Sequence, residues 1–281
     1  MDKVRQALDR ARAERAAAGI EGDRVVATIE TRPEGAAGDT SHGPPSSALA
    51  RALAVGADLL DRHRVLRPDD RSPAAQAFRM LRTQILQRMR ENGWQTLGVV
   101  SARSLDGKTT VAANLAIAIA ADPRHTAVLV DLDLHRPAVA KLFGAGADDD
   151  VAEVLRERST VDAMMLKPTG MERLRLLPAR LGGAEGAPGL VARPSCEALL
   201  SELKHRYTNR IIVVDMPPLL DNDDALTLAP LCDCLLFVVA EGRTARGDVT
   251  RALTLLRETP VIGTVLNNCS SLSPAPAPAQ R

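Results

Sequence analysis

The chain has 281 residues, of which 45% are hydrophobic and 2% aromatic, and its formal net charge is only +1. This length suffices for one well-buried domain with additional segments. The balanced charge and scarce aromatic residues argue against a nucleic-acid-binding surface. The longest apolar runs have the length of strands, which excludes the roughly 20 apolar residues of a membrane-spanning helix.

The N-terminus of the chain and its cysteines bear on its location. The N-terminus carries charges throughout and has no apolar block before a small-residue cleavage site, so a secretory signal is not predicted. Cys196, Cys232, Cys234 and Cys269 are too scattered for a disulfide framework and are expected to be reduced. We therefore expect a cytoplasmic protein.

Composition divides the chain into four parts. We predict a charged helix over residues 1–20, a largely disordered linker over 21–70, an α/β domain over 71–269 and a disordered Pro/Ala tail over 270–281. The first helix has a thin apolar stripe, which leaves open whether it is a marginal helix in solvent or a docking helix for a partner.

The domain is predicted to begin with a long helix. Ser72 can cap this helix, Pro73 suits its first turn and Gly93 suits its end. Its apolar positions recur on one face and comprise Phe78, Leu81, Ile85 and Met89.

From residue 95 to 268, uninterrupted apolar runs such as TLGVVS, TAVLVD and RIIVVD alternate with helical patterns. Continuous Val, Ile and Leu strands indicate a sheet covered on both faces, and strand–helix alternation indicates parallel order. We therefore predict an α/β fold with a doubly wound, mostly parallel sheet. Such sheets bind ligands at the carboxyl ends of their strands.

The stretch VVSARSLDGKTTVAANLAIAIA predicts a strand, a turn and a helix, in the arrangement of a phosphate-binding loop. Gly107 would let the backbone approach a phosphate, Lys108 would reach the terminal phosphates, and Thr109 would offer its hydroxyl to Mg²⁺. Ala102, however, stands where the pattern G-x-x-x-x-G-K-[ST] has its first glycine. For this segment alone, an ordinary turn that contains Gly-Lys-Thr by chance stays open.

Two further strands end in carboxylates. Asp131 and Asp133 follow one buried run, and Asp215 follows another just before two prolines. One acidic strand end could simply cap a helix or pair with an arginine. These two acidic strand ends and the loop with Lys108 and Thr109, in sequential order at three strand ends, instead predict a nucleotide site in which Asp215 supports Mg²⁺.

From about residue 72 to 268 the chain resembles the bacterial tyrosine kinases (BY-kinases) of capsular and exopolysaccharide systems, relatives of the deviant-Walker partition ATPases. The loop SARSLDGKTT is similar to the family's S-x-x-P-G-x-G-K-[ST]-T, which also lacks the early glycine. VLVDLDLHRP resembles the family's second Walker-type motif, and IIVVDMPP looks like its Walker B. AFRMLRTQI is similar to the helix before the first strand, and VIGTVLNN resembles the last strand. The resemblance implies a P-loop NTPase fold with ATP and Mg²⁺ as cofactors.

The resemblance also implies roles for particular residues. Those expected to bind the nucleotide are Ser101, Leu105, Asp106, Gly107, Lys108, Thr109 and Thr110, with Asn267 near the adenine. Those expected to be catalytic are Lys108, Asp131, Asp133 and Asp215, the two middle aspartates helping to activate the attacking hydroxyl. The expected Mg²⁺ ligands are Thr109, Asp131 and Asp215.

The chain departs from this family in several places. Its tail has no tyrosine cluster, and Tyr207, its only tyrosine, precedes a buried strand where core packing is expected. His135 stands where the family has an arginine. Gln76 replaces the glutamate of an interface motif, which leaves Arg79 and Arg82 as candidates for a homo-oligomer contact.

Two functions from different classes follow. The first is a Mg-ATP-dependent kinase or ATPase of the BY-kinase type in exopolysaccharide or capsule synthesis or export. It would lie in the cytoplasm or at the inner membrane beside a membrane co-polymerase or chain-length regulator. Its turnover is expected to be slow, because Arg103, Ser104 and Leu105 replace the usual Pro and Gly.

The second function is a nucleotide-switched binding module without kinase activity, like partition ATPases. The loop of those proteins carries an additional lysine near its start, where this chain has Ala102 and Arg103, and this difference favours the first function. A degenerate domain that binds no nucleotide is disfavoured by the three motifs together. Asp221, Asp223 and Asp224 are expected to cap the next helix rather than to form another acidic site.

Overall fold

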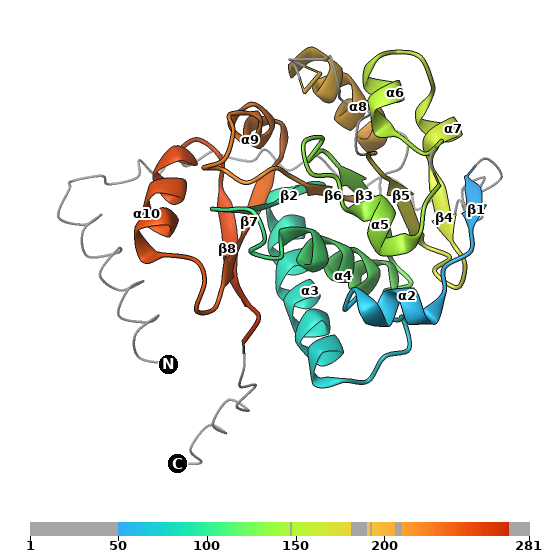
Figure 1. Cartoon of the computed structure of the whole chain (residues 1–281), viewed down its shortest axis with the longest axis horizontal. Helices are drawn as coiled ribbons and strands as arrows, with labels where there is room; N and C mark the ends of the chain where they lie inside the picture. The colour runs from blue at the N-terminus through green and yellow to red at the C-terminus, as the bar shows by residue number, and fades with distance from the viewer. Residues whose placement is uncertain (1–49, 147, 181–189, 192, 206–209, 270–281) are drawn as a thin grey trace, which may run out of the picture. The chain divides into compact units, whose positions relative to one another are not determined.

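The computed structural model describes residues 50–146, 148–180, 190, 191, 193–205 and 210–269 (Figure 1). The elements of its first half are β1 (Arg51–Leu53), α2 (Ala57–Arg62), α3 (Pro73–Asn92), β2 (Thr96–Ser101), α4 (Lys108–Ala120), β3 (Thr126–Asp131) and α5 (Val139–Phe143). Those that follow are α6 (Val151–Leu155), α7 (Val161–Met164), β4 (Leu166–Pro168), β5 (Leu174–Leu177), α8 (Arg193–His205), β6 (Arg210–Asp215), α9 (Asp224–Leu228), the 3₁₀ turn η1 (Ala229–Leu231), β7 (Cys234–Ala240), α10 (Arg246–Leu255) and β8 (Val261–Asn267).

One sheet of eight strands runs through the described residues in the order β1-β4-β5-β3-β6-β2-β7-β8. Neighbouring strands are parallel except for β4 and β5, which form an antiparallel pair. The central strands β2 and β6 are buried at every position, in keeping with their continuous apolar sequences. The α/β fold with a mostly parallel sheet is therefore confirmed.

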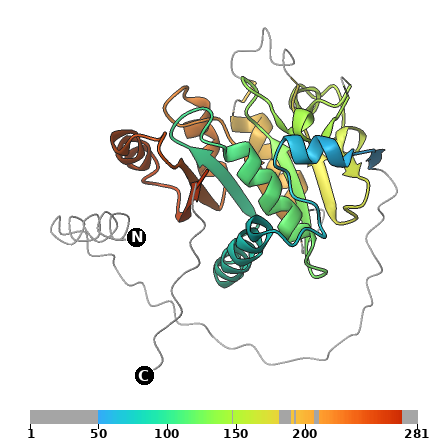
Figure 2. The ribbon, with the colours of Figure 1, turned by 60° about the horizontal axis from the view of Figure 1, so that its bottom comes forward.

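Helices cover both faces of this sheet, and each face has its own apolar core. Alternate residues of β3 point to opposite faces: Val128 and Val130 join one core, and Ala127 and Leu129 join the other. The second core also takes side chains from α3 and α4, which lie side by side in Figures 1 and 2. The first core takes side chains from α6 and α8. The sheet is therefore doubly wound.

Helix α3 has the termini that its sequence predicts. The Ser72 hydroxyl accepts a hydrogen bond from the Ala75 amide at 3.2 Å, Pro73 is the first helical residue, and Gly93 ends the helix in the left-handed conformation. Ile85 and Met89 are buried on its sheet-facing side.

The expected linker over residues 21–70 is wrong for its last part, because residues 51–53 and 57–62 form β1 and α2. Strand β1 pairs with β4, and Leu60 and Val65 are buried. A strand of three residues is too short to show an alternating pattern in the sequence. Its hydrogen-bond partner, β4, is also distant in the chain. The expected helix over residues 1–20, most of the linker, Tyr207 and the tail over 270–281 lie outside the described residues.

None of the helices in the described ranges has both the length and the apolar character of a membrane span.

Candidate nucleotide site

Three motifs of the sequence meet at one edge of the sheet, because β3, β6 and β2 are neighbours. Asp131 and Asp215 are register partners at the carboxyl ends of β3 and β6. The loop that leads into α4 follows the carboxyl end of β2, where Ser101 is fully buried. Parallel order alone brings these strand ends together, which is the usual place for a ligand in such a fold.

The turn between β2 and α4 is held tightly against the end of β8. Gly107 has a φ of +90°, and a Cβ atom there would lie 2.0 Å from the Asn267 side-chain nitrogen. That nitrogen donates a hydrogen bond to the Asp106 carbonyl oxygen at 3.0 Å. The backbone conformation therefore favours glycine at position 107, and a Cβ there would also push the Asn267 side chain from its hydrogen bond with Asp106.

The rest of the turn contains no glycine, although one of its residues adopts a backbone conformation that glycine favours. Leu105 has a φ of +69°, which is costly for a residue with a Cβ, and its side chain is 72% exposed. The Asp106 carboxylate is buried and accepts the Arg103 amide at 3.1 Å, and the Ser101 hydroxyl donates to the Arg103 carbonyl at 2.7 Å. The second Asp106 carboxylate oxygen has no hydrogen-bond partner among the described residues. The loop conformation therefore depends on polar contacts at its base.

Lys108 lies between two carboxylates at the start of α4. Its Nζ is 2.7 Å from Asp133 Oδ2 and 3.3 Å from Asp215 Oδ1. Burial alone would lower the pKa of this ammonium, but the charges of Asp215, Asp133 and Asp131 together raise the pKa of Lys108 to about 12. The ammonium is therefore charged at neutral pH and compensates part of a buried negative cluster.

Thr109 and Asp131 complete this cluster. The Thr109 hydroxyl donates to Asp215 Oδ2 at 2.6 Å. Asp131 Oδ2 accepts the Ala138 and Val139 amides, each at 3.0 Å, which anchors the chain as it leaves β3.

The two register-paired aspartates titrate unusually. Burial, and then the charge of Asp215, raise the pKa of Asp131 well above its ordinary value. Burial also raises the pKa of Asp215, and Lys108 counteracts this only in part. Three carboxylates, Asp131, Asp133 and Asp215, face one ammonium here, so a further cation at this place would be favourable.

The side chains in the cluster suit Mg²⁺. A hydroxyl and carboxylates are hard oxygen donors of the kind that Mg²⁺ prefers, and this ion usually takes one or two carboxylates together with phosphate oxygens and water. No group of three or more His, Cys, Asp or Glu in the described part of the chain is arranged to hold a metal by itself. The residues therefore fit an ion that arrives with a nucleotide better than a metal bound by protein ligands alone.

Comparison with known proteins assigns the chain to a family. The family described as ParA, the NUBPL iron-transfer P-loop NTPases, matches residues 94–277. This chain is a ParA-type P-loop NTPase. Two curated proteins and one solved structure locate it more closely among the relatives of this family.

The chain is 30% identical over 203 residues to the succinoglycan biosynthesis transport protein ExoP of Rhizobium meliloti (strain 1021). This alignment covers 70% of this chain but only 25% of ExoP. It is 27% identical over 201 residues to CapB of Staphylococcus aureus, named as a candidate tyrosine-protein kinase, with 70% of this chain and 85% of CapB covered. The crystal structure of the chimerical protein CapA2B2 has its fold, with a TM-score of 0.64 and 22% identity over 79% of this chain and 96% of that one. The predicted place among BY-kinase P-loop ATPases is thus confirmed.

Not all of the predicted features of this BY-kinase domain lie where the sequence suggested. The three acidic residues after β6 do not cap α9. Asp223 occupies the N-cap position without a side-chain capping bond, Asp221 accepts hydrogen bonds from Ser104, and Asp224 pairs with His135 at 2.9 Å. Asp221 and Asp224 are thus bound by donors from distant parts of the chain, which local sequence could not reveal.

Two contacts at the site were missed from sequence. Arg103 makes a forked ion pair with Asp248, at 3.1 and 3.2 Å, and also lies 3.5 Å from Asp221. Asp248 reads in the sequence only as an ordinary acidic residue in the first turn of α10.

The two arginines expected at an oligomer interface make hydrogen bonds within this chain. Arg79 donates to the Asp70 carbonyl oxygen at 2.9 Å, and Arg82 donates to the Ala118 carbonyl oxygen at 3.2 Å. Their predicted contact with a second copy stays a prediction.

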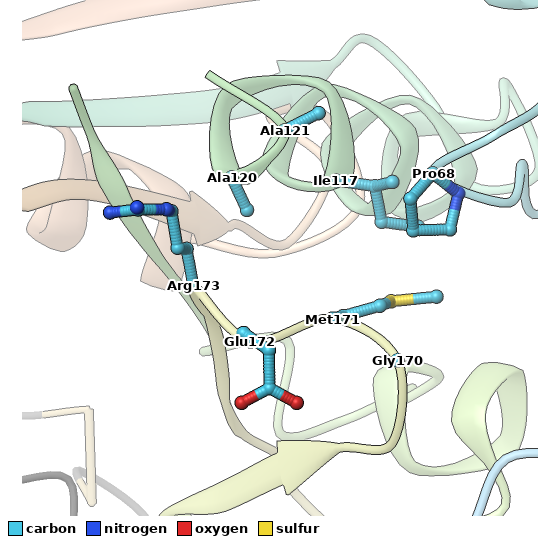
Figure 3. Close-up of a pocket in the computed structure, with 8 residues that line it drawn as sticks. All are labelled: Pro68, Ile117, Ala120, Ala121, Gly170, Met171, Glu172 and Arg173. Carbon is cyan, nitrogen blue, oxygen red and sulfur yellow. The ribbon is translucent and has the colours of Figure 1, made fainter. Parts of the chain in front are cut away.

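A cavity of about 220 Å³ lies at the opposite end of α4 from Lys108. It is lined by Pro68, Ile117, Ala120, Ala121, Gly170, Met171, Glu172 and Arg173, and Figure 3 shows Ile117, Pro68 and Met171 around its hollow. A helix of thirteen residues separates this cavity from the loop, which is about 18 Å along the axis. The cavity is therefore no part of the nucleotide site.

Proposed function

We propose that this BY-kinase domain binds Mg-ATP at the carboxyl edge of the sheet and transfers or hydrolyses its terminal phosphate. The observation that carries the proposal is the buried Lys108 ammonium between Asp133 and Asp215, beside the Thr109 hydroxyl. A buried cation at the start of a helix that follows a glycine-containing turn suits a phosphate chain.

Each residue then has a distinct role. Lys108 exchanges its carboxylate partners for the phosphates, and the amides of the loop hold the same group. Thr109 and Asp215 hold Mg²⁺, which when bound neutralises the charge that develops on the transferred phosphate. Asp131 and Asp133 orient or deprotonate the attacking hydroxyl or water. Ser101, Leu105, Asp106, Gly107, Thr110 and Asn267 complete the nucleotide-binding set.

We further propose that the protein acts in the synthesis or export of a capsule or exopolysaccharide, at the cytoplasmic side of a membrane and beside a co-polymerase. The similarity to ExoP, a succinoglycan biosynthesis transport protein, supports this setting. The chain spans about a quarter of ExoP, so the partner and the polysaccharide belong to the proposal alone.

The alternative is a nucleotide-switched module that hydrolyses ATP without passing phosphate to a protein. Two facts favour it: the matching family is ParA, and the chain has a single tyrosine, Tyr207. In that case ATP would change the assembly of the protein, and hydrolysis would reset it.

Magnesium-dependent turnover of radiolabelled ATP tests both forms of the proposal. The wild-type chain should release labelled phosphate, and Lys108→Met should lose at least about a hundredfold of this rate because the phosphates lose their charge partner. Lys204→Met, which removes a lysine from an ion pair with Asp233 outside the site, is the matched control. Normal hydrolysis by Lys108→Met would contradict the assignment.

Label on protein distinguishes the two forms. Transfer to a purified co-polymerase, or to Tyr207 with loss of label in Tyr207→Phe, supports the kinase. Phosphate release together with an ATP-dependent change in molecular mass and no labelled protein supports the switch.

A further inference from the structure

Four side chains from three distant segments form what we call the loop clamp: Arg103, Ser104, Asp221 and Asp248. Asp221 Oδ2 accepts hydrogen bonds from the amide of Ser104, at 3.0 Å, and from its hydroxyl. Arg103 makes the forked ion pair with Asp248 and reaches Asp221. The middle of the phosphate loop is thus tied both to the segment after β6 and to the first turn of α10.

The loop needs such support because of its own sequence. Phosphate loops commonly use glycine where the backbone must take unusual angles. Here Leu105 takes a φ of +69° with a side chain that is 72% exposed, so packing of that side chain does little to compensate the strain. The clamp contacts immediately precede this residue in the chain.

The position of Asp221 connects the clamp to the chemistry. Asp215 accepts a hydrogen bond from the Thr109 hydroxyl. Six residues further along the same segment, Asp221 accepts hydrogen bonds from Ser104. The end of β6 and the connection that follows it therefore contact both the start of α4 and the middle of the phosphate loop.

We propose that Asp221 and Asp248 are positioning residues for the phosphate loop, holding Arg103 and Ser104 so that the loop has its phosphate-binding shape before a nucleotide arrives. This role rests on the proposed nucleotide binding. Binding then costs less, because the ordering of the loop has already been achieved in the free protein.

The chemistry of the contacts supports a firm hold. The forked arrangement of a guanidinium on a carboxylate is both stronger and more directional than a single neutral hydrogen bond. Hydrogen bonding to Asp248, and then the charge of that residue, raise the pKa of Arg103, while the bond from Arg103 holds the pKa of Asp248 below its usual range. Burial works against Asp221, but its hydrogen bonds from Ser104 and Arg103 prevail and lower its pKa.

The test compares Asp221→Asn with Asp223→Asn in the full-length chain. Asp223 lies in the same acidic segment but makes no side-chain capping bond and no clamp contact, so it controls for the loss of one charge. Arg103→Ala is compared in the same way with Arg251→Ala, because Arg251 lies 3.8 Å from Asp248 but does not belong to the loop. Three properties are measured: calorimetric affinity for Mg-ADP and for Mg-pyrophosphate, hydrogen exchange of the amides of residues 102–108 without nucleotide, and the thermal unfolding midpoint.

We expect Asp221→Asn and Arg103→Ala each to lower the affinity for both ligands by about tenfold, since charge-assisted hydrogen bonds are lost from the loop. Equal losses for Mg-ADP and Mg-pyrophosphate are expected because the clamp acts on the phosphate-binding part. Loop amides should exchange faster, while the unfolding midpoint stays within about 2 °C of that of the matched control.

Three results would overturn the role: affinities equal to those of the controls, tighter binding in the variants, or unchanged exchange in the loop. A fall in the unfolding midpoint without any selective loss of affinity would also overturn it, because the contacts would then be merely structural. If the wild-type chain itself fails to bind Mg-ADP, the proposed function fails and takes the positioning role with it. Normal wild-type binding with unaffected variants rejects the positioning role alone.

Discussion

Replacing Lys108 by methionine should strongly destabilise the protein when no nucleotide is present. The ammonium lies 2.7 Å from Asp133 and 3.3 Å from Asp215, and all three side chains are buried. With an effective dielectric constant of about 20, these two attractions are worth about 6 and about 5 kcal/mol before desolvation. The cost of removing the ammonium from water offsets several kcal/mol of this.

The expected net loss is about 3–5 kcal/mol, which is the usual effect of leaving buried charges without their partner. For a domain of this size it corresponds to a fall in the unfolding midpoint of about 6–20 °C. Methionine keeps most of the lysine volume, so a cavity adds little to this value.

The loss should depend on pH in a defined direction. Burial already raises the pKa of Asp131 and Asp215 in the folded state, and loss of the ammonium raises each pKa further. Such groups bind more protons when folded, so stability falls as the pH rises through the folded-state pKa and is regained as the pH falls. The difference between Lys108→Met and wild type should therefore be larger at about pH 8 than at about pH 5.5.

Urea or thermal unfolding at both pH values measures this effect. Lys204→Met is the control, since Lys204 lies 2.8 Å from Asp233 in a pair that is about a quarter exposed and should lose only about 1 kcal/mol. An unfolding midpoint for Lys108→Met equal to that of wild type at the higher pH would refute the electrostatic account. So would an equal loss at both pH values.

Two further substitutions in the phosphate loop and one at the amino-terminal end of β2 are tested by thermal unfolding. Gly107→Ala should lower the free energy of unfolding by about 2–4 kcal/mol through backbone strain and the approach of Asn267. The control Gly170→Ala, at a φ of +79° with nothing within 4 Å of its new Cβ, should lower it by only about 1 kcal/mol. Leu105→Gly should raise the unfolding midpoint by about 2 °C, because relief of strain exceeds the entropy cost of glycine; a lower midpoint would show that the leucine side chain matters. Asp233→Ala should cost about 2–3 kcal/mol, since its carboxylate accepts the backbone amides of residues 95 and 96 and the Lys204 ammonium; a loss below about 1 kcal/mol would contradict this.

Much of the site was predictable because parallel strands place their carboxyl ends at one edge. Once the strands before Lys108, Asp131 and Asp215 are recognised from their apolar sequences, their proximity follows from the fold class. The start of α3 was predictable for a local reason, since Ser72 and Pro73 act within a single turn.

Contacts between distant segments were not predictable. The 36 basic and 35 acidic residues permit a great many ion pairs, and nothing in their spacing selects Arg103 with Asp248. The pairing of β1 with β4 escaped notice for the same reason, because only the folded chain brings Arg51 opposite Leu166.

The missing glycine of the phosphate loop illustrates the limit of motif reading. Ala102 is buried and is not among the described residues with positive φ, so its backbone does not require glycine. Strain occurs instead at Leu105, where the strict motif permits any residue. The motif thus predicted a phosphate-binding loop, but it did not predict which position has the strained backbone.

If the proposed function holds, the charge in the cluster also predicts that nucleotide and metal bind together. If Lys108 moves to the phosphates, Asp133 and Asp215 lose their buried cation, which is unfavourable unless Mg²⁺ replaces it. If Mg²⁺ binds first, it meets an ammonium already in place and gains little. Coupling between two ligands is reciprocal, so Mg²⁺ should tighten ADP binding by the same factor as ADP tightens Mg²⁺ binding, about 100-fold for a coupling near 3 kcal/mol.

Calorimetric titration of ADP with and without Mg²⁺ measures this factor. In Asp215→Asn the factor should shrink towards one, because the carboxylate that accepts the Thr109 hydroxyl and is proposed to hold Mg²⁺ is gone; an undiminished factor would show that the metal is held elsewhere.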